Sequence, residues 1–240
     1  MSRADKTWWR PQQRDWWMAV LFVIGASCFT LGGIVTQWSS VSRPAIGYVF
    51  FVGSIFFTTA GALQYAESLA THRRIDWVSS LIQLIGTILF NISTFAALRH
   101  NLTTHQENAR VWAPDAFGSI AFLVSSAMAF YGVRSRWWCF EWRSRDWDVA
   151  TLNLLGSVAF GISAVASLVE PSTGEPVSAH IANSGTSLGG ICFLVAAAIL
   201  IPGVAATGSS RSDDATRPVN DELGAGEPDR TTARQAGPLH

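Results

Sequence analysis

Long apolar runs separated by short polar stretches dominate the chain up to about residue 204. Each run has close to the ~20 residues that a helix needs to cross about 30 Å of hydrocarbon. None carries Asp, Glu, Lys or Arg in its interior, and so many apolar helices in succession would leave a soluble protein almost no polar surface. The pattern predicts an all-α integral membrane protein with six transmembrane helices, at 16–36, 46–65, 78–98, 116–133, 149–169 and 181–202.

A sequence pattern recurs at the start of every odd-numbered run. The segments RDWWMAVLFVIGASCF (14–29), IDWVSSLIQLIGTILF (75–90) and RDWDVATLNLLGSVAF (145–160) share Asp-Trp, a Gly nine residues after that Trp, and a Phe four residues further on. The even-numbered runs align as well, without gaps, as VGSIFFTTAGA, FGSIAFLVSSA and LGGICFLVAAA. We therefore expect three tandem two-helix hairpin repeats, at 16–66, 77–134 and 147–204, that all face the same way across the membrane.

The aligned runs each carry a Gly and, four residues later, a Phe. Positions i and i+4 lie on one face of a helix. Within lipid, a Gly allows a neighbouring backbone to approach closely, and the Phe can fill the adjoining groove. We predict that these residues pack the helices together, an interpretation that we favour over a Gly-lined pore. They are Gly25, Gly53, Gly86, Gly118, Gly156 and Gly189, with Phe29, Phe57, Phe90, Phe122, Phe160 and Phe193.

The distribution of basic residues predicts the orientation. Lys and Arg number four in the segment up to the first run, two in the 66–77 loop and four in the 134–147 loop, whereas the alternate loops carry only Arg43, Arg99 and Arg110. Because basic residues flanking spans favour the cytoplasm, we expect residues 1–15 and both termini to be cytoplasmic. Residues 205–240 are rich in small, polar and charged side chains, which predicts a disordered cytoplasmic tail.

Segments such as GSIFF and RIDWVSSLIQLIGTILFNISTFAAL resemble those of the YrhK-like family of bacterial integral membrane proteins. The resemblance covers residues 14–204 and rests on Gly, Phe and other aromatic positions. It implies short two-span units in a bacterial cytoplasmic (inner) membrane, with no established activity and no catalytic residue to carry over.

Catalytic and metal-binding motifs do not stand out in the sequence. Nothing matches a nucleophile elbow, a P-loop, HExxH or a dinucleotide-binding Gly motif. His100, His105 and Glu107 could form a metal site outside the membrane, but their spacing matches no strong zinc pattern, so we favour solvated loop residues. The net charge of zero gives no indication of a nucleic-acid partner. We therefore predict no catalytic residue, cofactor or metal.

A few amide side chains interrupt the predicted spans. We favour hydrogen bonds between helices for them, because neutral amides in membranes hold helices together more often than they bind ligands. The alternative is a polar track for a solute. The track would comprise Gln83, Asn91, Asn153 and Asn183.

These observations predict a non-enzymatic membrane scaffold or partner-binding protein. Its partners would be the lipid bilayer and another membrane or cytoplasmic protein, contacted through the tail and the 134–147 loop. The alternative is a permease or channel for a small neutral solute. The central turns of the predicted spans carry no charged residue and no His, which argues against proton coupling. A cavity shared by Gln83, Asn91 and Asn153 would favour transport.

Overall fold

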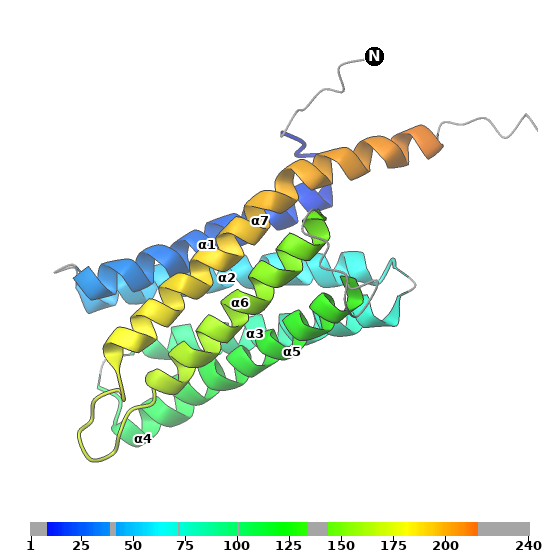
Figure 1. The fold of residues 1–240 in the computed structure, drawn as a ribbon. Helices are drawn as coiled ribbons and strands as arrows, with labels where there is room; N and C mark the ends of the chain where they lie inside the picture. The colour runs from blue at the N-terminus through cyan, green and yellow to red at the C-terminus, as the bar shows by residue number, and fades with distance from the viewer. Residues whose placement is uncertain (1–8, 39–41, 72, 100, 134–143, 216–240) are drawn as a thin grey trace, which may run out of the picture.

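The computed structural model describes residues 9–38, 42–71, 73–99, 101–133 and 144–215, which are almost entirely helical. Within the described residues, six helical stretches are long and apolar enough to cross a membrane, which confirms the predicted all-α fold class with six transmembrane helices. A short helix and a π-helical turn lead directly into the fourth of them (Figure 1). The elements are α1 (Arg14–Trp38), α2 (Arg43–Ser68), α3 (Arg74–Ala97), α4 (Thr104–Glu107), η1 (Asn108–Trp112), α5 (Ala113–Val133), α6 (Arg145–Ala166) and α7 (Ala179–Ala215).

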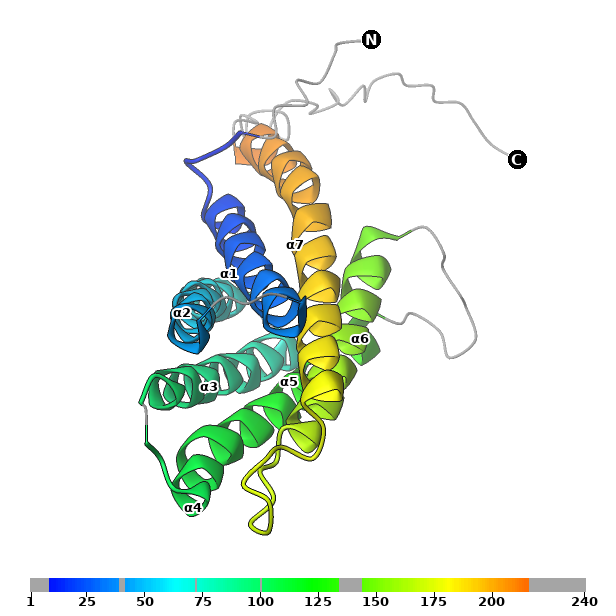
Figure 2. The same ribbon diagram turned by 90° about the vertical axis from the view of Figure 1, so that its left-hand side faces the viewer.

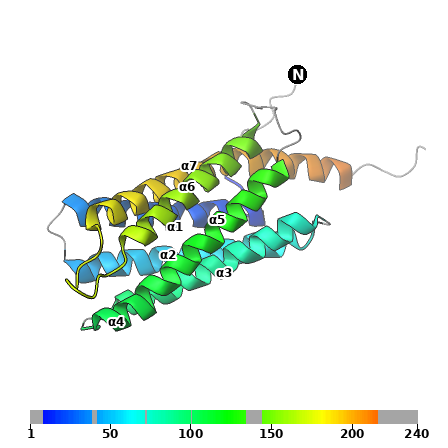
Figure 3. The same cartoon turned by 60° about the horizontal axis from the view of Figure 1, so that its bottom comes forward.

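The long helices form a closed ring in the order of the chain. Each packs against the next along the sequence, and α7 returns to pack against α1 (Figure 2). The first turn of α1 and the last of α7 lie at one end of the bundle, here called the terminal end. The short helix α4 and the loop between α6 and α7 lie at the other, here called the distal end (Figures 1 and 3). Both ends of the described chain therefore lie on the same side of the bundle.

Many large apolar side chains lie on the outside of the bundle, and the polar side chains buried inside it are small. On α3, the exposed residues include Ile85, Ile88, Ile92 and Phe95. By contrast, the buried polar side chains in the described part of the chain are all Ser or Thr. This distribution suits lipid, where no hydrophobic force drives helices together and small residues allow close packing.

The fourth span begins earlier than the sequence pattern predicts. We expected a loop up to residue 115, but helical structure runs from Thr104 to Val133. Thr103 and Gln106 form a reciprocal cap, in which the Thr103 hydroxyl accepts from the Gln106 amide and the Gln106 side chain accepts from the Thr103 amide. The turn before Pro114, which has no N–H to donate, is π-helical. Apolar content locates a span's centre, whereas these polar residues decide where its helix begins.

The last span ends later than predicted. Helix α7 continues to Ala215, so the expectation of disorder from residue 205 is wrong for residues 205–215. Extending an existing helix adds one hydrogen bond for each residue fixed and needs no new nucleus, so a polar segment can continue it. Residues 216–240, most of the predicted 134–147 contact loop and residues 1–8 lie outside the described part of the chain.

Candidate functional site

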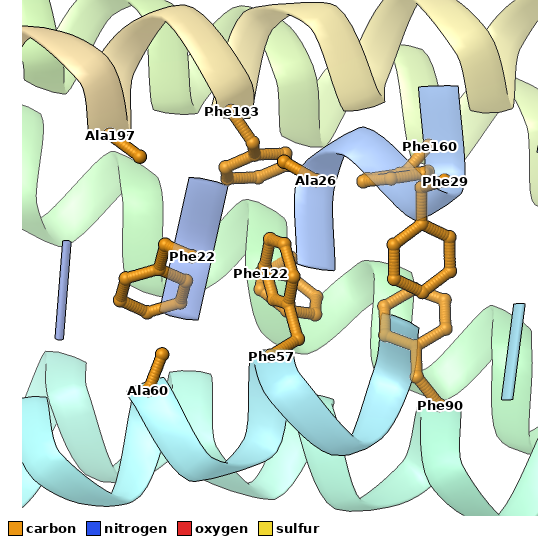
Figure 4. Packing of buried hydrophobic residues seen from close by; sticks show 10 residues of the cluster. All are labelled: Phe22, Ala26, Phe29, Phe57, Ala60, Phe90, Phe122, Phe160, Phe193 and Ala197. Atoms are coloured by element: carbon orange, nitrogen blue, oxygen red, sulfur yellow. The ribbon is translucent and has the colours of Figure 1, made fainter. Parts of the chain in front are cut away.

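Six Phe side chains fill the centre of the ring as two stacked triangles (Figure 4). Phe29, Phe90 and Phe160, from α1, α3 and α6, have ring centroids 5.8–6.3 Å apart. Phe57, Phe122 and Phe193, from α2, α5 and α7, form the second triangle with centroids 5.7–6.1 Å apart. These are the six Phe residues that the aligned runs share, and the structure brings all of them together.

The two triangles also contact each other within each predicted hairpin. Centroid separations are 5.7 Å for Phe29–Phe57, 5.2 Å for Phe90–Phe122 and 5.6 Å for Phe160–Phe193. The six side chains are only 1–7% exposed. Such separations lie in the range of attractive aromatic contacts. The result is a trigonal prism of rings, here called the Phe prism, with each hairpin supplying one edge.

The aligned Gly residues face each other in pairs, one pair in each predicted hairpin. A Cβ atom added to Gly25 would lie 2.9 Å from the carbonyl oxygen of Gly53, and the reverse substitution would place it 3.2 Å from Gly25 O. The equivalent distances are 3.1 and 3.2 Å for Gly86 and Gly118, and 3.1 and 3.0 Å for Gly156 and Gly189. The absence of a side chain at these positions lets each pair of backbones meet.

The predicted polar-track residues do not share one cavity. Gln83 donates to Gln64 at 3.2 Å. Asn91 accepts from Ser54 at 2.7 Å and donates to Thr58, all between α2 and α3. The side chain of Asn153 makes no hydrogen bond to any described residue, whereas its backbone carbonyl oxygen accepts from the Ser157 hydroxyl. Of the four, Asn183 alone lines the pocket described below.

A close contact between α1 and α7 was not anticipated from the sequence. A Cβ at Gly190 would lie 2.6 Å from the Thr30 hydroxyl and 2.8 Å from its amide nitrogen. In the aligned runs, Ser54 and Ser119 occupy the position of Gly190, and each of them hydrogen-bonds to the following hairpin. The sequence contained one signal for this contact: the Gly-Ser of VGSIFF and FGSIAF is replaced by Gly-Gly in LGGICF, and Gly permits a closer helix approach than Ser.

A pocket of about 500 Å³ opens at the distal end of the ring. Its floor includes Phe29, Phe90 and Phe160, the distal triangle of the Phe prism. Three acidic residues line it: Asp115 from α5, Glu107 from α4 and Glu175 from the α6–α7 loop. Among the described residues that line it, none is Lys, Arg or His. The pocket therefore combines aromatic surface with one sign of charge.

The rim of the pocket is held by side chains of the π-helical turn. Asn108 donates to the carbonyl oxygen of Val169 at 2.7 Å and accepts from the Val169 amide at 3.1 Å. Trp112 donates its indole N–H to the carbonyl oxygen of Ala164 at 2.8 Å. The Asn108 bonds join the π-helical turn to the α6–α7 loop, and the Trp112 bond joins it to α6. Such π-helical turns are frequent at functional sites. The turn thus positions the loop that carries Glu175.

The hydroxyl groups in the pocket are already committed as donors. Ser93 donates to the carbonyl oxygen of Val111 at 2.8 Å, Thr94 to that of Phe90 at 2.8 Å and Ser163 to that of Ala182 at 2.7 Å. A nucleophilic hydroxyl needs a base that takes its proton, and these hydroxyls are paired with carbonyls instead.

No metal-binding cluster of three or more His, Cys, Asp or Glu side chains occurs among the described residues. His105 lies in the helix α4 rather than in the predicted loop, and His100 lies outside the described part of the chain. The outer metal site considered from the sequence thus gains no geometric support.

No model of a known protein family, no curated protein and no solved structure matches this chain. The resemblance to the YrhK-like family stays a prediction. Function must therefore be argued from the prism, the pocket and the membrane-spanning build.

Proposed function

We propose that this polytopic membrane protein is a non-enzymatic scaffold or partner-binding protein. The observation that carries the proposal is the Phe prism, which fills the centre of the ring with buried aromatic side chains. A channel needs a continuous path between the two ends of the bundle, whereas dense side-chain packing at its centre supports a structural role. The positions of Gln83 and Asn91 in the α2–α3 contact favour the same interpretation.

Solute flux through liposomes tests this proposal. The purified protein is reconstituted, and entry of glycerol and urea is followed by stopped-flow light scattering against protein-free liposomes. We expect equal permeability, because the prism leaves no room for either solute. Faster, saturable entry of either solute would overturn the proposal and favour a pore if a larger side chain introduced beside the prism abolishes that entry.

A permease is the second candidate, and the distal pocket is the observation that favours it. A pocket closed beneath by an aromatic floor is the form expected of a transporter open to one side. Transport would require the three hairpins to move apart so that the floor opens toward the terminal end. Counterflow of a labelled ligand in liposomes separates the two candidates. Binding without exchange across the bilayer is expected of the scaffold, whereas exchange across the bilayer is expected of the permease.

The proposed location is a bacterial cytoplasmic membrane with both termini in the cytoplasm. The basic residues near the terminal end and the even number of spans support this orientation. Fusions of alkaline phosphatase and green fluorescent protein after Asn101, Gly174 and Thr71 test it. We expect phosphatase activity only from the first two, and fluorescence at those sites would reverse the orientation.

A further inference from the structure

The distal pocket contains a carboxylate that the protein itself leaves without compensation. Asp115 is partly buried in the first turn of α5 and lines the pocket. It forms no hydrogen bond or ion pair with any described residue; the one ion pair in the described part of the chain joins Arg73 and Asp76, near the terminal end. A charged side chain within a membrane-spanning helix is costly and is retained where a partner or function stabilises it.

The remaining polar groups of the pocket do not replace that partner. Ser93 and Ser163 donate their protons to backbone carbonyls, and neither could neutralise a negative charge. Glu107 and Glu175 add charge of the same sign, and no basic side chain occurs among the described residues of the lining. Three carboxylates around one cavity raise the local concentration of cations. The pocket's electrostatics therefore favour a positively charged occupant.

The floor indicates which kind of cation would fit. The rings of Phe29, Phe90 and Phe160 close the bottom, and the indole of Trp112 is held in the lining by its bond to the Ala164 carbonyl. Aromatic faces attract ammonium groups and also accept apolar surface. A volume of about 500 Å³ is suited to a small organic molecule.

From these features we propose that the distal pocket binds a small organic cation, an ammonium group on an apolar or aromatic body. Asp115 faces the ammonium group, the prism floor and Trp112 receive its body, and Glu107 and Glu175 attract it to the mouth. This differs from the neutral solute considered from the sequence. The proposed binding does not depend on whether the protein is a scaffold or a permease, because binding can be measured separately from flux.

Other cations fit the pocket less well. Calcium takes six to eight oxygen ligands and magnesium an octahedral shell, and both need closely spaced oxygens rather than an aromatic floor. The described residues contain no cluster of acidic, His or Cys side chains able to hold a metal ion. An ammonium ion with a carbon body uses both parts of the lining.

Binding of phenethylamine to the full-length protein tests the proposal. Phenethyl alcohol is the matched neutral ligand and calcium chloride the metal control, all measured by isothermal titration calorimetry in phosphatidylglycerol nanodiscs that lack amine headgroups. Empty nanodiscs correct for partitioning into lipid. We expect saturable binding of the amine at least about ten-fold tighter than that of the alcohol, with no competition by calcium.

The residue assignment is tested with Asp115→Asn, which keeps the size of the side chain and removes its charge. We expect this variant to lower amine affinity at least about ten-fold and to leave alcohol affinity unchanged. Asp146→Asn at the terminal end is the matched control and should bind like the parent. Should Asp115→Asn fail to fold, Glu107→Gln supplies a second variant, with a smaller loss of amine affinity expected.

Three results would overturn the proposal: no saturable amine binding at millimolar concentration, equal affinity for the alcohol, or unchanged amine affinity in a folded Asp115→Asn protein. Added phosphatidylethanolamine distinguishes the source of the ammonium group. If phosphatidylethanolamine competes with phenethylamine, the occupant is a lipid headgroup. If it does not compete, the occupant is a free amine.

Discussion

The Phe prism and the distal pocket belong to the same ring and use equivalent positions of the three predicted hairpins, but only the prism repeats its residues. Four residues after each aligned Gly stands a Phe, six times over. Three residues before the aligned Gly of the even-numbered spans stand Phe50, Asp115 and Thr186, and all three line the pocket. One layer is uniform, and the next is different in each hairpin.

This difference separates the two tasks of the bundle. Equal residues at equivalent positions produce the three-fold pattern of ring contacts that closes the centre. Of the three unequal residues in the distal layer, only Asp115 is acidic, so this layer contributes one carboxylate to the cavity. Variants that affect one layer and spare the other can test this division.

The largest effect is expected from removing a ring of the prism. Phe122→Ala deletes a side chain that is 1% exposed and contacts three other Phe rings. Large-to-small changes of this kind cost about 3–5 kcal/mol in buried sites. Phe117→Ala, on the same helix but 63% exposed, is the matched control and should cost far less. Unfolding by dodecyl sulfate in mixed micelles measures both, and equal losses would contradict a special role for the prism.

A bulky residue in a Gly pair should have the next largest effect. A Cβ at Gly86 would lie 3.1 Å from Gly118 O and 3.2 Å from the Ala121 side chain, so Gly86→Leu must push α3 from α5. We expect about 2–3 kcal/mol of destabilisation, typical of overpacking. At Gly161 an added Cβ meets no atom within 4 Å, so Gly161→Leu is the control. If both variants melt like the parent, the Gly contact is unimportant.

A smaller effect is expected where the three-fold pattern is broken. Gly190→Ser restores the residue found at the equivalent positions 54 and 119, but its side chain would collide with Thr30. We expect about 1–2 kcal/mol of destabilisation through the α1–α7 contact. The reciprocal change, Ser119→Gly, removes one bond to Phe160 O and should cost less. Greater stability in Gly190→Ser would show that α7 can move away from α1 without loss.

The smallest effect on global stability is expected at the rim of the pocket. Asn108→Ala removes both part-buried bonds to Val169, each worth about 1 kcal/mol, and so loosens only the α6–α7 loop. Amide hydrogen exchange should accelerate in residues 168–177 and stay unchanged at the Phe prism. Asn153→Ala, whose lost side chain bonds to no described residue, is the control. Faster exchange at the prism would mean that the two layers are not independent.

Much of this architecture could be predicted from local patterns. The apolar runs located all six membrane-spanning helices, because crossing a bilayer requires a length and composition that are visible along the chain. The errors were at helix ends, at Thr104 and Ala215, where caps and helix continuation outweigh hydropathy. The site residues divide in the same way: the aligned Gly and Phe positions could be singled out, while Asp115 was taken as part of a loop.

The sequence by itself determined the membrane build, the number of spans and which residues recur at equal spacing. These properties depend on composition and on distances along one helix. Only the tertiary structure decided that α7 closes the ring on α1, that the six Phe rings meet, and that Asp115, Glu107 and Glu175 line one cavity. Such juxtapositions depend on how each helix is rotated about its axis and how closely its neighbours approach. Both are set by packing among residues far apart in the chain.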